Sequence, residues 1–140
     1  MKKGIHIAAA LFLALLLISP VFAQSFTRLD STGFSDFQPG PLLVYPLGGE
    51  VNLSGLDSLE FKWQRDAANT SYFIFRLYKG YNMYESGLIL KQQVGSSEIS
   101  TRVKSGLFED GQVYTWSLVQ VFFTGSKSDK SFSSFKVVKK

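Results

Sequence analysis

The sequence contains no cysteine, and its only histidine is His6. Cysteine and histidine supply the nucleophile–base pairs of the Ser-His-Asp and Cys-His systems and the usual ligands of zinc, copper and non-haem iron. Beyond residue 6 the chain therefore lacks the means for these catalytic systems and metal sites. The absence of cysteine also excludes disulfides, so that a small exported domain must be held together by packing alone.

Carboxylates remain, but their positions do not suggest a site. Glu109 and Asp110 stand beside a glycine in a turn, and Asp57, Glu60 and Asp66 are spread over another turn and a strand. Neither a calcium-binding Asp-x-Asp-x-Asp loop nor a glycine-rich phosphate loop occurs. We therefore expect no enzyme activity and no cofactor, and we assign no catalytic or metal-binding residue.

The first residues have the layout of a secretory signal peptide. Lys2 and Lys3 precede an apolar run over residues 7–18, Pro20 ends that run, and small residues stand at the two cleavage-site positions of Val21-Phe22-Ala23. The run is shorter than the roughly 20 residues that a membrane-spanning helix needs. We expect residues 1–23 to be removed and the product to be periplasmic or extracellular without a transmembrane anchor. A leader of this kind on a cysteine-free chain indicates a bacterial protein.

The remaining chain is rich in aromatic residues and only weakly charged. The full sequence contains 13 Phe, 6 Tyr and 2 Trp, and all but two of the Phe lie beyond the leader, where they are the obvious material for a core without disulfides. The formal net charge is +4 and includes two leader lysines, which is too little to indicate a nucleic-acid partner. The length from Gln24 to Lys140 suits one domain with its own core.

Proline, glycine and serine mark residues 24–41 as an arm or linker, and short strands between turn signals follow over residues 42–140. This spacing predicts an all-β fold, a seven-stranded antiparallel sandwich of the immunoglobulin-like kind. We expect the strands at 42–45, 59–63, 71–79, 88–94, 98–103, 112–123 and 132–138.

Alternation along 59–63 and 112–123 predicts which side chains face the core, because successive residues of a strand point to opposite faces. Both faces of 71–79 are apolar, as in a central strand, and we assign its Phe/Leu row to the core. The closing strand should add Phe132, with Phe135 as a second choice. The expected core residues are Phe61, Trp63, Phe73, Phe75, Leu77, Tyr114, Trp116 and Leu118.

Several of these residues resemble bacterial fibronectin type III domains over residues 42–140. The motifs are Pro46, Phe61-x-Trp63, Ala67-Ala68 before Tyr72-Phe73-Ile74-Phe75, then Leu107, Gly111 and Tyr114-Thr115-Trp116-Ser117-Leu118, and a closing Ser131-Phe132 with Ser134-Phe135-Lys136-Val137. The resemblance implies a tyrosine corner at Tyr114 and an extracellular spacer or binding module.

Two positions depart from the family pattern. The spacing from Leu107 to Tyr114 is about one residue longer than usual. Gln120 stands where a small apolar residue is usual, and it marks a bulge late in its own strand.

Three surfaces are candidates for binding. Tyr81, Met83 and Tyr84 lie in the 80–87 loop, where they either anchor a partner or fold back over the end of the sandwich. Tyr72 and Ile74, with Tyr78, form the outer row of a central strand. This row is an exposed stripe, unless the register is reversed or the N-terminal arm covers it. A third group is either an anion-binding patch or a solvated end: Lys127, Lys130, Lys136, Lys139 and Lys140.

The composition and the resemblance together favour an exported, non-enzymatic binding or accessory module that contacts a protein or a glycan. Two alternatives stay open. A carbohydrate-binding module would use an exposed, coplanar Tyr81 and Tyr84 pair, and a structural subunit of a cell-envelope assembly would use long unprotected strand edges.

We predict that the exported protein begins at Gln24, because cleavage follows Ala23. Amino-terminal sequencing or intact-mass measurement of secreted material tests this. Recovery of chains that retain Met1 in a membrane fraction would contradict it.

Overall fold

The computed structural model describes residues 38–64 and 69–140. The expected signal peptide, most of the arm and the Ala67-Ala68 turn lie outside these described residues. Within them the chain forms eight strands and two short 3-10 helices. The strands are β1 (Leu43–Tyr45), β2 (Glu50–Asn52), β3 (Ser58–Trp63), β4 (Thr70–Lys79), β5 (Leu88–Gly95), β6 (Ser100–Lys104), β7 (Val113–Phe122) and β8 (Ser131–Val138), and the helices are η2 (Glu85–Gly87) and η3 (Ser105–Leu107).

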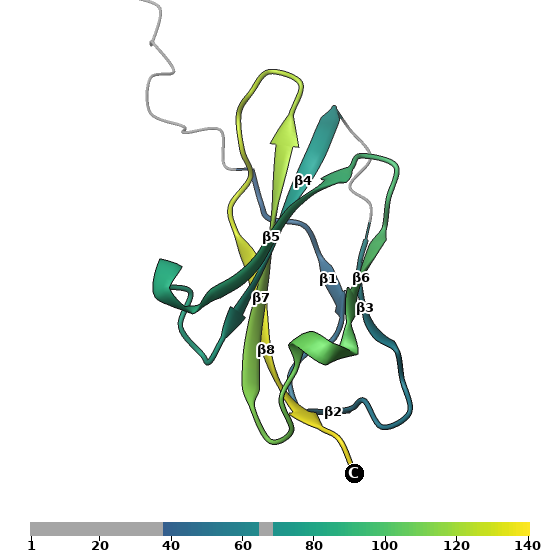
Figure 1. The fold of residues 1–140 in the computed structure, drawn as a ribbon. Coiled ribbons are helices and arrows are strands. Elements are labelled where there is room, and N and C mark those ends of the chain that lie inside the picture. Colours follow the sequence, from purple (N-terminus) through teal and green to yellow (C-terminus); the bar gives the residue numbers. More distant parts are fainter. Residues whose placement is uncertain (1–37, 65–68) are drawn as a thin grey trace, which may run out of the picture. The chain divides into compact units, whose positions relative to one another are not determined.

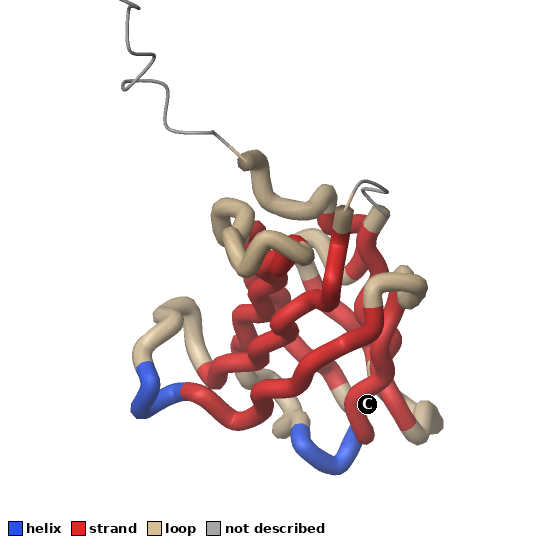
Figure 2. The backbone as a smooth tube through the Cα atoms, turned by 90° about the horizontal axis from the view of Figure 1, so that it is seen from above, coloured by secondary structure: helices blue, strands red, loops and turns tan. Residues whose placement is uncertain are grey.

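The strands form two facing sheets (Figures 1 and 2). One sheet has the order β1-β3-β6 and the other the order β2-β8-β7-β4-β5. All seven expected strands coincide with observed ones to within two residues. The sandwich architecture predicted from the alternation of apolar residues is therefore confirmed.

The expected strand number and the purely antiparallel pairing were both wrong. Gly48 and Gly49 both have positive φ, and an eighth strand, β2, follows them. This strand runs parallel to β8, with Val51 opposite Val137. Only one of its three side chains is buried, so it carries almost no alternation signal. The chain thus leaves the first sheet after β1 and joins the second one at β2.

The predicted core is confirmed, since all eight of its side chains are buried. Phe61 of β3 lies at the centre of a cluster of rings. Its ring centroid lies 5.0 Å from that of Phe75, 5.1 Å from that of Trp116 and 5.8 Å from that of Phe135. These partners belong to the five-stranded sheet, so the cluster joins the two layers. Each edge-to-face pair contributes roughly 0.5–1.5 kcal/mol beyond burial.

The first choice for the core residue of β8 was wrong and the second choice was right, and Phe108 rather than Leu107 of the family-like motif is buried. Phe132 is 60% exposed and faces outward opposite Ser117, whereas Phe135 fills the core. Leu107 is exposed at the end of η3, and Phe108 is buried, with its ring 5.0 Å from that of Tyr114. The extra residue before the tyrosine is thereby explained, because Phe108 occupies the core position in place of Leu107.

The tyrosine corner implied by the resemblance is present. The Tyr114 hydroxyl accepts a hydrogen bond from the backbone N–H of Glu109 at 2.8 Å. Gln120 is buried, and its Nε2 donates to Thr70 Oγ1 at 2.6 Å. The pairing of β4 with β7 shifts register between Thr70 and Tyr72, so the extra residue lies on β4. The bulge predicted in the strand of Gln120 therefore lies on the partner strand.

A hydrogen bond ties the core to the point where the chain changes sheets. The indole Nε1 of the fully buried Trp116 donates to the carbonyl oxygen of Pro46 at 2.9 Å. Pro46 follows a cis peptide bond and lies between β1 and β2. Trp116 therefore fills the core and also satisfies a buried carbonyl at the crossover.

Replacing Trp116 by alanine should lower the free energy of unfolding by roughly 3–5 kcal/mol, because it removes a central ring and leaves a cavity. Trp116→Phe should cost less, mainly through the unpaired Pro46 carbonyl, and Phe132→Ala should change stability by no more than about 0.5 kcal/mol. Urea unfolding measures all three. A Trp116→Ala protein as stable as the parent would refute this account of the core.

Candidate functional site

The β4–β5 connection, residues 80–87, is the most prominent candidate surface. Figure 1 shows it beside the five-stranded sheet, with η2 turned away from the sandwich. Its start is held to β7, because the N–H of Gly80 donates to Val113 O at 2.8 Å and Thr115 Oγ1 donates to Gly80 O at 2.7 Å. At its end, the N–H of Gly87 donates to Tyr84 O at 3.0 Å. The connection is therefore a hydrogen-bonded turn anchored to rigid strands.

A side chain at position 87 would crowd the base of this connection. A Cβ there would lie 3.1 Å from the carbonyl oxygen of Lys79. Glycine thus allows the returning backbone to pass close to the end of β4.

Two large rings stand out from this connection. Tyr81 is 72% exposed and Tyr84 is 69% exposed, while Met83 between them is half-buried. Neither ring stacks on another aromatic ring of the described residues. The two tyrosines are therefore not covers over the open end of the sandwich, which was the alternative interpretation. Both keep their hydroxyl and much of their ring face available to a partner.

Tyr81 lies near an ion pair at the same end of the sheet. Lys136 Nζ donates to Glu50 Oε1 at 2.8 Å. This hydrogen bond raises the pKa of Lys136, and the nearby Tyr81 hydroxyl adds a smaller effect in the same direction. The same bond lowers the pKa of Glu50 below its ordinary value. Tyr81 thus lies within electrostatic reach of this ion pair.

The outer row of β4 is a separate surface. Phe73, Phe75 and Leu77 face the core as predicted, and Tyr72 and Ile74 are half-buried on the opposite face. Tyr78 belongs to the same outer row but is only 2% exposed, so it adds nothing to an exposed stripe. At a rise of about 3.3 Å per residue along β4, Tyr72 lies roughly 25 Å from the connection that follows the strand. The candidate binding residues therefore form two surfaces.

The five lysines do not form one patch. Lys127 and Lys130 precede β8, whereas Lys139 and Lys140 follow it. Lys136 pairs with Glu50, and Lys139 Nζ donates to the carbonyl oxygens of Ser105 and Phe108 at 2.8 and 2.5 Å. The lysines are thus spread over the two ends of β8, and two of them, Lys136 and Lys139, already form contacts within the protein.

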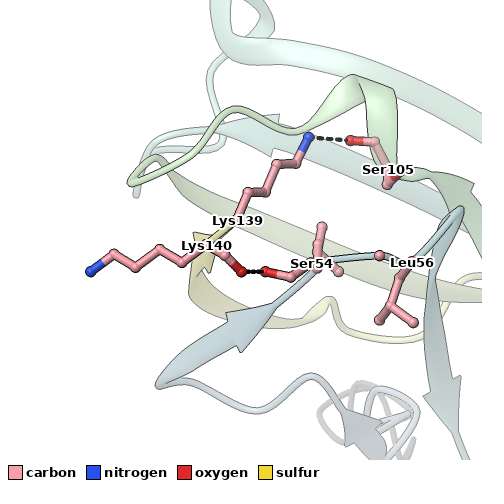
Figure 3. Close-up of a pocket in the computed structure, with 7 residues that line it drawn as sticks. Ser54, Leu56, Ser105, Lys139 and Lys140 are labelled. Atoms are coloured by element: carbon pink, nitrogen blue, oxygen red, sulfur yellow. Dashed lines mark hydrogen bonds between the residues drawn. The ribbon is translucent and has the colours of Figure 1, made fainter.

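A shallow pocket of about 470 Å³ brings together segments that are far apart in the sequence (Figure 3). Its polar groups already serve the fold. Lys139 Nζ donates to the carbonyl oxygen of Ser105, and Ser54 Oγ donates to the carbonyl oxygen of Lys140. The side-chain amino group of Lys140 points away from the pocket (Figure 3). No sequence signal marked this pocket, because its lining residues meet only in the folded chain. They are Leu53, Ser54, Gly55, Leu56, Ser105, Lys139 and Lys140.

The resolved pKa shifts all follow from surface ion pairs. Glu60 has its pKa lowered by a hydrogen bond from Lys62, and Lys79 has its pKa raised by a hydrogen bond to Glu109. Shifts in these directions move each pKa further from neutral pH, whereas a general acid or base needs a pKa near the working pH. Across residues 38–64 and 69–140, no group of three or more metal-ligating side chains gathers, and no helix is long and apolar enough to span a membrane.

Removing the exposed rings should leave the fold intact. We expect Tyr81→Ala and Tyr84→Ala each to change the free energy of unfolding by no more than about 0.5 kcal/mol. The matched control is Tyr78→Ala in the preceding strand, which removes a buried ring and should cost about 3 kcal/mol. If denaturant unfolding showed equal losses for all three variants, the loop rings would belong to the core.

No protein-family model matches the sequence, and no curated protein matches it. The fold does match solved structures. A computationally redesigned β-sandwich protein aligns with a TM-score of 0.53 at 13% identity, covering 73% of this chain and 96% of that one. The FN1–FN3 domains of chicken CNTN1 give 0.52 at 13% identity, covering 73% of this chain and 33% of that one.

A single fn3 domain of human contactin 1 aligns with a TM-score of 0.49 at 16% identity, covering 72% of this chain and 78% of that one. Identities this low establish the architecture alone. With the two-sheet order and the tyrosine corner described above, they support one conclusion: the chain has a fibronectin type III-like β-sandwich fold.

Proposed function

We propose that this protein is an exported binding or accessory module without catalytic activity, and that it contacts a protein or a glycan through the β4–β5 connection. The observation that carries the proposal is the exposure of Tyr81 and Tyr84, about seven-tenths of each residue, on a connection whose start is hydrogen-bonded to β7. The leader at residues 1–23 supports export to the periplasm or the outside of the cell.

Tyrosine is well suited to such a surface. It offers a large ring with only two side-chain torsions, so little conformational entropy is lost when a partner fixes it. The ring face stacks on apolar groups or sugar rings, while the hydroxyl donates and accepts hydrogen bonds. Because hydrogen bonds to β7 hold the start of the connection and one more closes its end, less backbone ordering is needed on binding.

The types and environments of the polar residues support a role without catalysis. Beyond residue 6 the chain has neither histidine nor cysteine, and the carboxyls with resolved pKa shifts are held ionised by lysines. Glu109 is bonded to Lys79, and Asp110 Oδ1 accepts the N–H of Lys139 at 2.7 Å. Glu109 and Asp110 therefore form structural contacts, one with a surface lysine and one with the backbone near the end of the chain.

The second candidate is a structural subunit of a cell-envelope assembly, which would join its neighbours through strand edges. One observation favours it: β5, an eight-residue strand, stands at the edge of its sheet. The other three edge strands are shorter, at three, three and five residues.

Alanine at Tyr81 and Tyr84 together should weaken partner binding by about 2 kcal/mol or more, since exposed aromatic anchors dominate interface energies. The exported protein would be applied to a glycan array and to envelope proteins of the source organism. The control is Phe123→Ala, which removes a 75% exposed ring from the turn after β7. Equal binding by the parent and the double variant would move the contact surface elsewhere.

A further inference from the structure

The free edge of β5 differs from the other sheet edges in length and in charge. The sheet orders leave β1, β2, β5 and β6 at the edges, and β5 is the longest of them. Its outer edge pairs with no strand in the described part of the chain. An unpaired edge presents a row of backbone N–H and C=O groups that another strand can use.

Two cations meet at this edge. Arg76 on β4 lies directly opposite Lys91 on β5. Phe75 and Leu77 face the core, so Arg76 points to the outer face. Lys91 does the same, because Leu90 packs against the core and the Gln92 amide donates inward to the Thr101 hydroxyl. Like charges directly opposite each other destabilise an antiparallel pair.

Neither cation has a counter-charge within the described residues. The ion pairs found there use other basic side chains, namely Lys62, Lys79, Arg102 and Lys136. The register row that runs from Phe132 through Ser117 to Arg76 and Lys91 therefore ends at the edge on two adjacent positive charges, which form no ion pair in the described part of the chain.

We propose that the edge of β5 accepts an extended acidic peptide segment as an additional strand of the five-stranded sheet. A glutamate or aspartate opposite Lys91 would become the next member of that row and would place an opposite charge beside the two cations. The backbone of the segment would pair with the free N–H and C=O groups of β5, as in other cases of strand addition.

A second copy of this chain is a poor occupant of the edge. Pairing β5 with itself about its middle would bring Lys91 and Arg76 of both copies onto one face, where they repel. A carboxylated polysaccharide would neutralise the charges, but it would leave the unpaired backbone groups of the edge unused. The combination of a free edge and two cations thus favours an acidic peptide.

The test uses the purified protein and a fluorescent peptide, Ser-Thr-Val-Thr-Glu-Thr-Val-Thr-Ser, in an anisotropy titration. A peptide with lysine in place of glutamate should bind about tenfold more weakly. So should a peptide in which proline replaces both threonines beside the glutamate, because it cannot pair its backbone. Hydrogen exchange of the β5 amides should slow when the glutamate peptide is bound.

Charge reversal on the protein supplies the matched comparison. Lys91→Glu should make the protein prefer the lysine peptide over the glutamate peptide. Lys104→Glu, the same change at an exposed position of β6, should leave the preference for the glutamate peptide in place. Tyr81→Ala and Tyr84→Ala should leave peptide binding unchanged, which separates this edge from the proposed β4–β5 surface. A thermal melt of each variant verifies folding.

Four results would overturn the proposal. One is no binding of the glutamate peptide at millimolar protein. Another is equal binding of the proline peptide, and a third is equal loss from Lys91→Glu and Lys104→Glu, since both indicate unspecific electrostatics. The last is Lys91-dependent binding of polygalacturonate without binding of any peptide, which would assign the cations to a glycan.

Discussion

The contact of Phe61 with the rings of the opposite sheet is the interaction on which this structure depends. Without disulfides, the two layers are held by side-chain packing, and Phe61 places its ring against Phe75, Trp116 and Phe135 at the centre of that packing. Rings bury large apolar areas and impose preferred contact angles, so they stabilise the sandwich and also fix how its sheets face each other.

Trp116 connects this packing to the path of the chain. Its indole N–H satisfies the Pro46 carbonyl where the chain passes from the three-stranded sheet to the five-stranded one. A buried carbonyl without a donor would be costly, so the hydrogen bond stabilises one position for this crossover. The parallel pairing of β2 with β8 follows from that crossover, and it brings Glu50 to Lys136.

A core built in this way leaves the periphery free for contacts. Tyr81 and Tyr84 stand on a connection whose hydrogen bonds go to its own backbone and to β7, and Lys91 lies on a strand whose inner side chains already face the core and β6. Within the described residues, neither exposed ring packs into the core and Lys91 forms no ion pair. These are the positions at which a stable scaffold carries binding without loss of its architecture.

The sequence by itself determined seven strands and the eight predicted core side chains, because alternation with a period of two is a local property that a single strand displays. Only the tertiary structure decided what depends on neighbours across the sheets. The three residues of β2 became a strand through pairing with β8, the bulge near Gln120 fell on β4, and Phe135 rather than Phe132 entered the core. The meeting of Arg76 and Lys91 likewise exists only in the register of two strands, which no single segment encodes.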